Sequence, residues 1–321
     1  MQIAFIVDPL ATLQAHHDTS VAMMQALESR GHRVYGLELA DLWVQDGQAH
    51  GQLQQLDLSP RQGSWYRVIQ TTAGALSQMD VVWMRKDPPV DTAYLYATHI
   101  LDLIDPAGTL VLNHPAGLRS ANEKVYALQF SAWTPRTVVS SQAAILKAFI
   151  EEEQKAVLKP LGGKGGEGIL ICNHGDPNIN SLIEISTQSG RIPVMVQEYL
   201  PQAKEGDKRI LLLEGDPIGA VNRVPGQGDF RGNIAAGGSV QKTVITDREK
   251  AMCADLAPVL KAAQLYFVGI DVIGEKLTEI NVTSPTMIQE ISQLAGIPLA
   301  DHVAAWLETK VAALPRHSAA V

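Results

Sequence analysis

Five glycines fall within the seven residues from 162 to 168, and short apolar runs at 156–158 and 169–171 flank them. Because glycine has no Cβ, such a loop lets the backbone approach a ligand closely and turn its N–H groups toward one point. The flanking runs are typical of strands, so we predict a strand–loop–strand hairpin that closes over a nucleoside triphosphate. A mobile surface hairpin without a ligand is the alternative interpretation.

The same glycines at positions 163, 165 and 168 match G-x-G-x-x-G, the pattern of dinucleotide-binding domains. That pattern requires a helix directly after the glycines, whereas residues 169–171 favour a strand. The mismatch argues against a nicotinamide-dependent dehydrogenase.

A second informative stretch, residues 268–282, has the pattern of a hairpin that turns at residues 274–276. With a three-residue turn, Asp271 lies directly across from Glu279, and Asn281 shares the face of Glu279. Opposed carboxylates repel, so we expect a cation there, and oxygen ligands suit Mg²⁺ or Mn²⁺. Without a cation, the repulsion should raise the pKa of one carboxyl group. A two-residue turn would shift the register and leave only a solvent-facing acidic hairpin.

Elsewhere, the alternation of apolar runs and helical patterns indicates an α/β protein. The first ~115 residues predict a parallel α/β domain with strands at 3–7, 34–37, 81–84 and 110–112, a helix capped near Asp18 and a small hairpin at Asp46-Gly47. The remainder predicts an α+β region with strands at 156–159, 169–172, 194–197, 210–213 and 218–223 and helices at about 142–153 and 247–264.

The overall charge argues against several classes of partner. The 321 residues carry 34 acidic and 26 basic side chains, a net charge of −8, which disfavours binding to nucleic acid or to an anionic membrane. No apolar run reaches the ~18 residues of a membrane span. The two cysteines have no metal-type or CxxC spacing, so we expect a cytoplasmic protein.

Two lysines and a strand end are candidate nucleotide contacts. Lys159 ends an apolar strand and Lys124 follows Asn122-Glu123, but either lysine taken alone fits an ordinary solvated side chain better than a phosphate ligand. The segment Gln197-Glu198-Tyr199-Leu200-Pro201 has the pattern of a hinge whose backbone faces an adenine edge, although it also fits an ordinary strand end.

A long glycine-rich loop from 223 to 238 carries Arg223 and Arg231, and loops of this length are usually functional lids or disordered. An arginine in a lid can neutralise a developing oxyanion or a phosphate. No Ser/His/Asp triad or reactive-cysteine pattern is visible in the sequence. These features together favour phosphoryl and acyl transfer by positioned charge, without a protein nucleophile.

The order of these features resembles the ATP-grasp superfamily, and several segments resemble prokaryotic glutathione synthetase in particular. The similarity covers residues 1–310. The segments are Met84-Arg85-Lys86-Asp87-Pro88-Pro89, Leu118-Arg119-Ser120-Ala121-Asn122-Glu123-Lys124, Gly206-Asp207-Lys208-Arg209, Arg231-Gly232-Asn233, Ala235-Ala236-Gly237-Gly238 and Thr278-Glu279-Ile280-Asn281-Val282-Thr283-Ser284-Pro285-Thr286.

The resemblance implies a role for each matched residue. The implied ATP contacts are Lys124, Lys159, the loop Gly162, Gly163, Lys164, Gly165, Gly166, Glu167 and Gly168, the hinge Glu198, Tyr199 and Leu200, and Asp207. The implied catalytic residues are Arg209, Arg223 and Arg231, and the implied metal ligands are Asp271, Glu279 and Asn281. The implied substrate contacts are Asp18, Ser20, Arg85, Ser284 and Thr286.

The resemblance also implies the reaction, in which ATP with two Mg²⁺ or Mn²⁺ ions drives the joining of γ-glutamylcysteine to glycine through an acyl phosphate. It implies small-molecule substrates and a homo-oligomer, either a dimer or a tetramer. The expected units are an N-terminal pre-ATP-grasp domain over 1–118, a lid or central subdomain over 119–202, a C-terminal ATP-grasp subdomain over 203–314, and a tail over 315–321. The alternatives are another carboxylate–amine ligase, such as a D-alanine–D-alanine type, and a non-catalytic ATP-binding module.

Overall fold

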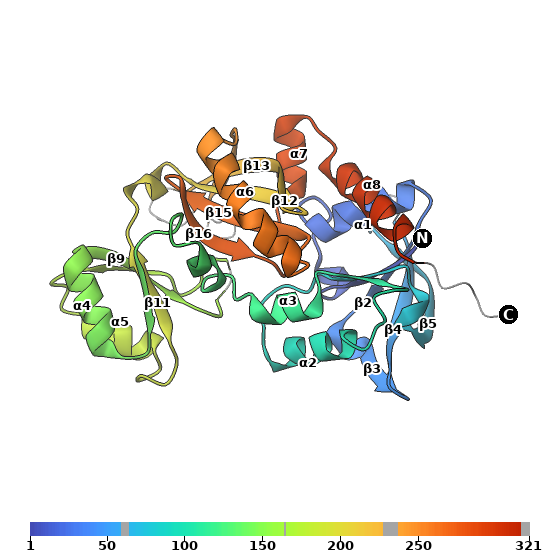
Figure 1. The fold of residues 1–321 in the computed structure, drawn as a ribbon, viewed down its shortest axis with the longest axis horizontal. Helices are drawn as coiled ribbons and strands as arrows, with labels where there is room; N and C mark the ends of the chain where they lie inside the picture. The colour runs from blue at the N-terminus through green and yellow to red at the C-terminus, as the bar shows by residue number, and fades with distance from the viewer. Residues whose placement is uncertain (59–63, 164, 227–236, 316–321) are drawn as a thin grey trace.

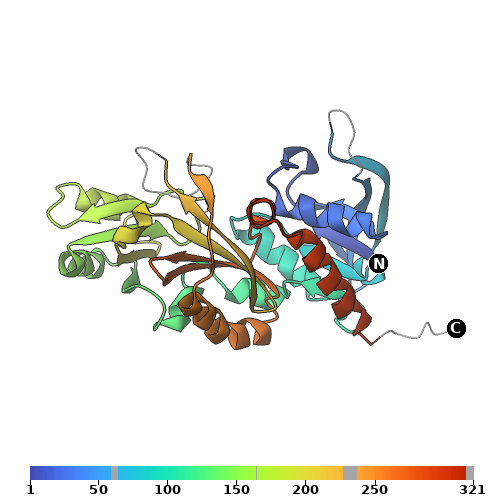
Figure 2. The same cartoon turned by 90° about the horizontal axis from the view of Figure 1, so that it is seen from above.

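The computed structural model describes residues 1–58, 64–163, 165–226 and 237–315, and its three sheets follow one another along the chain (Figure 1). We call them the N-terminal sheet (β1–β7), the lid sheet (β8–β11) and the C-terminal sheet (β12–β16). The lid sheet lies at one end of the molecule and the N-terminal sheet at the other (Figures 1 and 2). This arrangement confirms the expected α/β class, with an N-terminal α/β region followed by two α+β lobes.

The N-terminal sheet has the order β3-β4-β2-β1-β6-β7, with β5 paired to β4. Its strands are β1 (Gln2–Ile6), β2 (Arg33–Leu37), β3 (Leu42–Gln45), β4 (Gln48–Asp57), β5 (Arg67–Ala75), β6 (Val81–Met84) and β7 (Leu110–Leu112), and its helices are α1 (Thr19–Ser29), α2 (Thr92–Leu101) and α3 (Pro115–Ser120). Asp18 caps α1 as expected, because its carboxylate accepts hydrogen bonds from the amides of Ser20 and Val21 at 2.7 and 3.1 Å.

The pairing of this sheet is parallel only in part. β1 pairs in parallel with β2 and β6, and β6 pairs in parallel with β7, as the sequence predicts. β3, β4 and β5 add an antiparallel edge, of which the sequence predicted only the small hairpin that turns at Asp46-Gly47 and pairs β3 with the first residues of β4. The rest of β4 and all of β5 were missed because glutamine, histidine and threonine interrupt the apolar pattern that marks a strand.

The lid sheet is antiparallel, in the order β10-β9-β11-β8, and α4 and α5 accompany it. Its elements are β8 (Thr137–Ser140), α4 (Ala143–Glu153), β9 (Lys155–Pro160), β10 (Leu170–Asn173), α5 (Ile179–Ser186) and β11 (Val194–Glu198). It has a small core of its own, which includes Leu146, Leu158 and Val196.

The C-terminal sheet is also antiparallel, in the order β14-β13-β12-β15-β16. Its elements are β12 (Asp207–Leu213), β13 (Asp216–Val224), β14 (Ser239–Lys242), α6 (Asp247–Ala262), β15 (Phe267–Ile273), β16 (Lys276–Asn281), α7 (Ile288–Ala295) and α8 (Leu299–Ala312). The helix α8 returns to the N-terminal region and packs beside α1, where Glu308 pairs with Arg30 and His32 (Figure 2).

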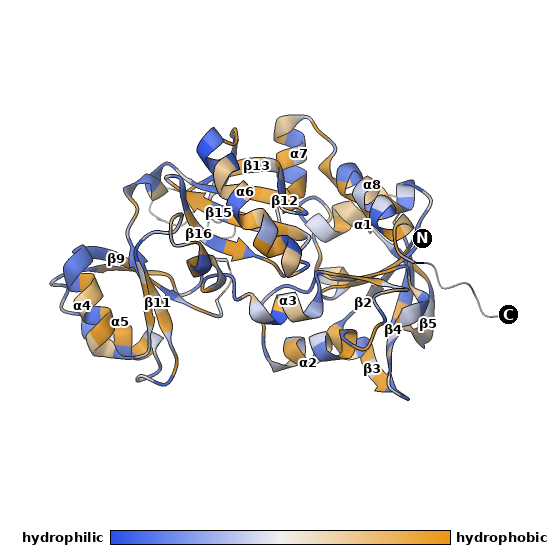
Figure 3. Cartoon of the chain, in the orientation of Figure 1, coloured by the Kyte–Doolittle hydropathy of each residue, from blue (hydrophilic) through white to orange (hydrophobic). Residues whose placement is uncertain are grey.

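Two shared cores join the N-terminal and C-terminal sheets. Trp83 of β6 stacks on Phe5 of β1 at 5.5 Å and meets Phe267 of β15 edge to face at 6.0 Å between ring centroids. Buried Asn113, after β7, bonds the backbone of Phe267 and Val282. Apolar residues predominate on the central strands of these sheets, and the surrounding helices carry both apolar and hydrophilic residues (Figure 3). None of the helices described is long and apolar enough to cross a membrane.

Candidate active site

A cavity of about 600 Å³ lies between the lid sheet and the C-terminal sheet. Most of the residues singled out in the sequence line it. They are Lys124, Lys159, Gly163, Gly165, Gly166, Glu167, Glu198, Tyr199, Leu200, Asp207, Arg209, Arg223, Asp271, Glu279, Asn281, Ser284 and Thr286. Gly162 and Gly168 belong to the same loop outside the lining, and Lys164 and Arg231 lie outside the described residues.

The acidic hairpin pairs Asp271 with Glu279 as the sequence predicts, but its turn length and register differ from those predicted. Asp271 of β15 lies opposite Glu279 of β16, and the pair places the two side chains on one face. The turn, however, has two residues, Gly274 and Glu275, both with positive φ. A register shift at Thr278 of β16 then restores the pairing that a two-residue turn would have displaced.

Asp271 is surrounded by arginine side chains from the neighbouring strands. Its carboxylate pairs with Nε of Arg209 at 2.5 Å and with Nη2 of Arg223 at 3.0 Å. Burial by itself raises the pKa of Asp271, but the two guanidinium groups outweigh burial and hold that pKa well below its ordinary value. The expectation that carboxylate repulsion raises a pKa at this position is therefore wrong for Asp271, because arginine charges already offset its own.

Asp207 completes this network at the start of β12. Its carboxylate accepts a hydrogen bond from Arg223 at 2.6 Å, yet burial raises the pKa of Asp207 to about 6 despite that contact. Among the described residues, Oδ1 of Asp207 and Nε of Arg223 are buried polar atoms without a hydrogen-bond partner. Such atoms beside a cavity are available to a polar ligand.

The donor set fits a hard divalent cation by its chemistry, because Asp271, Glu279 and Asn281 offer only oxygen ligands on one hairpin. Asn281 lies 3.3 Å from Asp271, measured from Nδ2 to Oδ2. Within the described ranges, no group of three or more His, Cys, Asp or Glu residues is arranged to hold a metal ion. A cation at Asp271 would share the carboxylate with Arg209 and Arg223.

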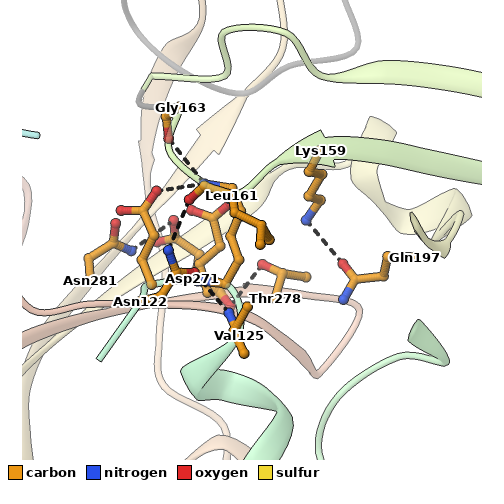
Figure 4. A network of polar contacts seen from close by, with 12 residues as sticks. Asn122, Val125, Lys159, Leu161, Gly163, Gln197, Asp271, Thr278 and Asn281 are labelled. Atoms are coloured by element: carbon orange, nitrogen blue, oxygen red, sulfur yellow. Dashed lines mark hydrogen bonds and ion pairs between the residues drawn. The ribbon is translucent and has the colours of Figure 1, made fainter. Parts of the chain in front are cut away.

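The two lysines have contrasting surroundings, and Figure 4 shows Lys159 beside Gln197. Nζ of Lys159 bonds the side-chain oxygen of Gln197 at 3.0 Å, and Gln197 in turn donates to Oγ1 of Thr137 at 2.9 Å. Burial lowers the pKa of Lys159. Nζ of Lys124 instead lies 2.6 Å from Glu123 and 3.8 Å from Glu279, and although burial lowers the pKa of Lys124, these carboxylates raise it overall.

The described residues of the glycine loop form no helix, and β9 and β10 pair in antiparallel fashion on either side of it, which confirms the hairpin and the rejection of the dinucleotide pattern. Gly165, Gly166 and Gly168 have positive φ angles, which favour glycine. At Gly168, an added Cβ would also lie 2.8 Å from Pro160. The loop is attached to the rest of the site by Lys124, whose Nζ bonds the carbonyl oxygen of Gly163 at 3.1 Å.

The hinge after β11 borders the same cavity. Glu198 accepts a hydrogen bond from the amide of Arg136 at 3.2 Å. The ammonium of Lys155 lies 3.8 Å from the ring centroid of Tyr199, a cation–π contact that holds the ring. The hinge therefore has a defined position next to the glycine loop.

Three expected substrate contacts from the N-terminal region lie outside the cavity lining. Buried Arg85 donates from Nε to Oγ of Ser20 at 3.0 Å and from Nη2 to the carbonyl oxygen of Pro285 at 2.9 Å. Asp18 caps α1. Pro285 lies between Ser284 and Thr286, which do line the cavity. Arg85 therefore contacts the backbone of that segment without lining the cavity itself.

Glu123 and Gln197 are among the polar lining residues that sequence reasoning missed. They directly precede Lys124 and Glu198, so their position next to predicted site residues was the only sign of them in the sequence. Burial of a charged side chain at Glu123 and the hydrogen bond from Gln197 to Lys159 depend on the folded chain.

Comparison with known proteins agrees with this geometry. The family model described as "Prokaryotic glutathione synthetase, N-terminal domain" matches residues 1–119, and "Prokaryotic glutathione synthetase, ATP-grasp domain" matches residues 123–296. A glutathione synthetase from Thermosynechococcus vestitus is 55% identical over 96% of this chain and 99% of its own length. One from Coxiella burnetii is 41% identical over 97% and 98%.

Solved structures agree at the level of the fold. The ATP-grasp ligase PsnB, in a complex with a precursor variant, Mg and ADP, has a TM-score of 0.64 at 17% identity and covers 96% of this chain and 98% of its own. The D-cycloserine synthetase DcsG has a TM-score of 0.64 at 14% identity, with coverage of 95% and 99%. Because both family models match and the sequence relatives span nearly the whole chain, this chain belongs to the prokaryotic glutathione synthetase family and is an ATP-dependent carbon–nitrogen ligase.

Proposed function

We propose that this ligase joins the cysteinyl carboxylate of γ-glutamylcysteine to the amine of glycine, with release of glutathione, ADP and phosphate. The observation that carries the proposal is one cavity lined by two lysines, two arginines, two carboxylates on facing strands and a glycine loop. A phosphoryl group passing between ATP and a carboxylate requires such an arrangement of positioned charge. The family membership supplies the two substrates.

In this proposal, ATP lies between the two antiparallel sheets. The hinge at Glu198, Tyr199 and Leu200 frames the adenine, and Asp207 contacts the ribose. Lys124 and Lys159 bind phosphate oxygens while Gly162, Gly163, Lys164, Gly165, Gly166, Glu167 and Gly168 close over them. The burial of Lys159 against neutral Gln197 supports its role, because a buried cation without a carboxylate in contact favours an anionic ligand.

The reaction then proceeds in two steps. A carboxylate oxygen of γ-glutamylcysteine attacks the γ-phosphorus of ATP, and the bond to the bridging oxygen breaks to give an acyl phosphate and ADP. The glycine amine attacks the acyl carbon, loses a proton, and expels phosphate from a tetrahedral intermediate. We propose that Arg209, Arg223 and Arg231 offset the negative charge, and that the closed loops exclude water from the acyl phosphate.

Asp271, Glu279 and Asn281 would hold the divalent cations, two Mg²⁺ or Mn²⁺ ions. When bound, such cations neutralise phosphate charge and orient the phosphate oxygens. The oxygen-only donor set on one hairpin supports this assignment.

For the substrates, we propose that Ser284 and Thr286 contact γ-glutamylcysteine and glycine, with Asp18, Ser20 and Arg85 nearby. The bond from Arg85 to Pro285 supports a coupling between the N-terminal residues and the Ser284–Thr286 segment. We further propose that each chain consists of three domains, over 1–118, 119–202 and 203–314, with a tail over 315–321. Two or four such chains would form a cytoplasmic dimer or tetramer.

Product analysis tests the function. ADP formation should require γ-glutamylcysteine and glycine together, with glutathione and ADP in equal amounts. Each substrate is omitted in turn, and D-alanine replaces both in a parallel reaction. Equal turnover with D-alanine alone would assign the chain to a different carboxylate–amine ligase, and ATP binding without any turnover would leave a non-catalytic module.

A further inference from the structure

The ammonium of Lys124 lies among three oxygen acceptors. Nζ is 2.6 Å from Oε1 of Glu123, 3.1 Å from the carbonyl oxygen of Gly163, and 3.8 Å from Oε1 of Glu279. The side chain of Lys124 is only 4% exposed, and those of Glu123 and Glu279 are 17% and 18% exposed. Two carboxylates thus compete for one buried cation, and Glu123 holds the closer contact.

Glu123 is fixed in place by the strand that carries the proposed metal ligands. Its carbonyl oxygen accepts a hydrogen bond from the amide of Ile280 at 2.8 Å, and Ile280 stands between Glu279 and Asn281 on β16. The side chain of Asn122 secures the same turn, because its oxygen accepts hydrogen bonds from the amides of Lys124 and Val125 at 3.2 and 3.1 Å (Figure 4). The backbone of Glu123 is thus bonded directly to the strand that carries Glu279.

We propose that Glu123 is a positioning residue that holds the ammonium of Lys124 away from Glu279 and so keeps the Glu279 carboxylate free for a divalent cation. The inference rests on the metal-binding role proposed for Glu279. Neither the ATP contacts nor the metal ligands assigned above include Glu123.

The physical reason is the cost of a buried charge without a partner of opposite charge. If residue 123 becomes neutral, the closest remaining carboxylate to Nζ is that of Glu279, and a small rotation of the lysine side chain turns their long 3.8 Å ion pair into a hydrogen-bonded one. A carboxylate held in a close ion pair is a poorer cation ligand. The main-chain bond from Ile280 to residue 123 survives the substitution, so the hairpin keeps its shape.

Direct binding of Mn²⁺ tests the proposal, with free Mn²⁺ measured by electron paramagnetic resonance at a saturating ADP concentration established for each protein. The set comprises the unchanged protein, Glu123→Gln, Lys124→Met, the double variant and Glu279→Gln. We expect Glu123→Gln to weaken Mn²⁺ binding about tenfold. The double variant should bind Mn²⁺ as tightly as Lys124→Met, because no lysine is left to occupy Glu279.

Two results would overturn the proposal. If Glu123→Gln binds Mn²⁺ as tightly as the unchanged protein, Glu123 does not position Lys124 for metal binding. If Glu123→Gln weakens Mn²⁺ binding by the same factor in the Lys124→Met background, Glu123 acts on the cation directly. If Glu279→Gln binds Mn²⁺ normally, the metal assignment itself fails, which is a separate outcome. A crystal structure of nucleotide-free Glu123→Gln provides a second readout. The distance from Nζ of Lys124 to Glu279 should fall below 3.8 Å, and an unmoved lysine contradicts the proposal.

Discussion

The two sheets that enclose the cavity treat their charged side chains in opposite ways. On the C-terminal sheet, Arg209, Arg223 and Asp271 are buried and already paired with one another. On the lid sheet, Lys159 is equally buried, but its contact is the neutral amide of Gln197. One wall of the site carries arginines that are already paired with carboxylates, whereas the other carries a lysine that an anionic ligand can neutralise.

The apolar cores of the two sheets also differ, in their extent and in whether they are shared with another sheet. Residues of the C-terminal sheet belong to two cores that include the N-terminal sheet, as the contact between Trp83 and Phe267 illustrates. The lid sheet relies on a small separate core around Leu158. We infer that the C-terminal sheet is a fixed platform and that the lid sheet opens more easily, because local stability follows the extent of apolar packing.

We expect the greatest loss of stability on the C-terminal sheet, where Asp271 pairs with Arg209 and Arg223. Asp271→Asn leaves two buried guanidinium groups without their shared carboxylate, so the free energy of unfolding should fall by about 3–5 kcal/mol. Urea denaturation measures the change, and Asp216→Asn, at an exposed aspartate on the same sheet, is the control. A loss no greater than that of the control would mean that the arginine pairs contribute little to stability.

A substitution in the lid core should act locally. Leu158→Ala removes a fully buried side chain next to Lys159, at a cost of about 2–5 kcal/mol. Hydrogen exchange should show lost protection in the lid strands and unchanged protection in β12 and β15. Leu211→Ala, in a shared core, should instead weaken both larger sheets. Equal loss everywhere in Leu158→Ala would remove the distinction between the two regions.

Removal of the lid cation should separate stability from binding. Lys159→Met eliminates a buried charge that has no carboxylate in contact, so stability at pH 7 should rise by about 1 kcal/mol. ATP binding should weaken about 100-fold, since a buried charge contact to phosphate is lost. Thermal unfolding and calorimetric titration measure the two changes, with the exposed Lys204→Met as the control. A marked loss of stability in Lys159→Met would mean that the buried charge of Lys159 stabilises the lid sheet.

The smallest effect concerns pH. Burial and the nearby Lys124 lower the pKa of Lys159, while Glu279, Asp207 and Asp271 oppose them. The unfolded chain therefore binds more protons than the folded protein between the lowered pKa and the ordinary value of 10.5, so stability rises with pH in that interval. The stability advantage of Lys159→Met over the unchanged protein should shrink as pH approaches 10.5, whereas a constant difference contradicts the lowered pKa.

The acidic hairpin illustrates how far sequence reasoning reached. The pairing of Asp271 with Glu279 was predicted from a three-residue turn, but the structure has a two-residue turn and a register shift at Thr278 that compensate for each other. Nothing in the side chain of Thr278 marks it as a bulge, because threonine is equally suited to a regular strand. The final pairing was predictable, and the path to it was not.

Elsewhere, prediction failed where the signal is not local. The parallel strands were found because their apolar runs are continuous, whereas β4 and β5 pair mainly with each other through polar residues. The arginine partners of Asp271 come from two other strands, so the hairpin alone could not show that the pKa of this carboxyl group is lowered. Contacts between distant segments, rather than residue types, account for these errors.

The central claim is that ATP activates the carboxylate of γ-glutamylcysteine as an acyl phosphate. Isotopic transfer tests it most directly. γ-Glutamylcysteine labelled with ¹⁸O in its cysteinyl carboxylate is converted with ATP and glycine, and the released phosphate is analysed by mass spectrometry. We expect one ¹⁸O atom in each phosphate, because the carboxylate oxygen that attacks the γ-phosphorus leaves with it. Phosphate without the label, formed together with glutathione, would contradict the mechanism.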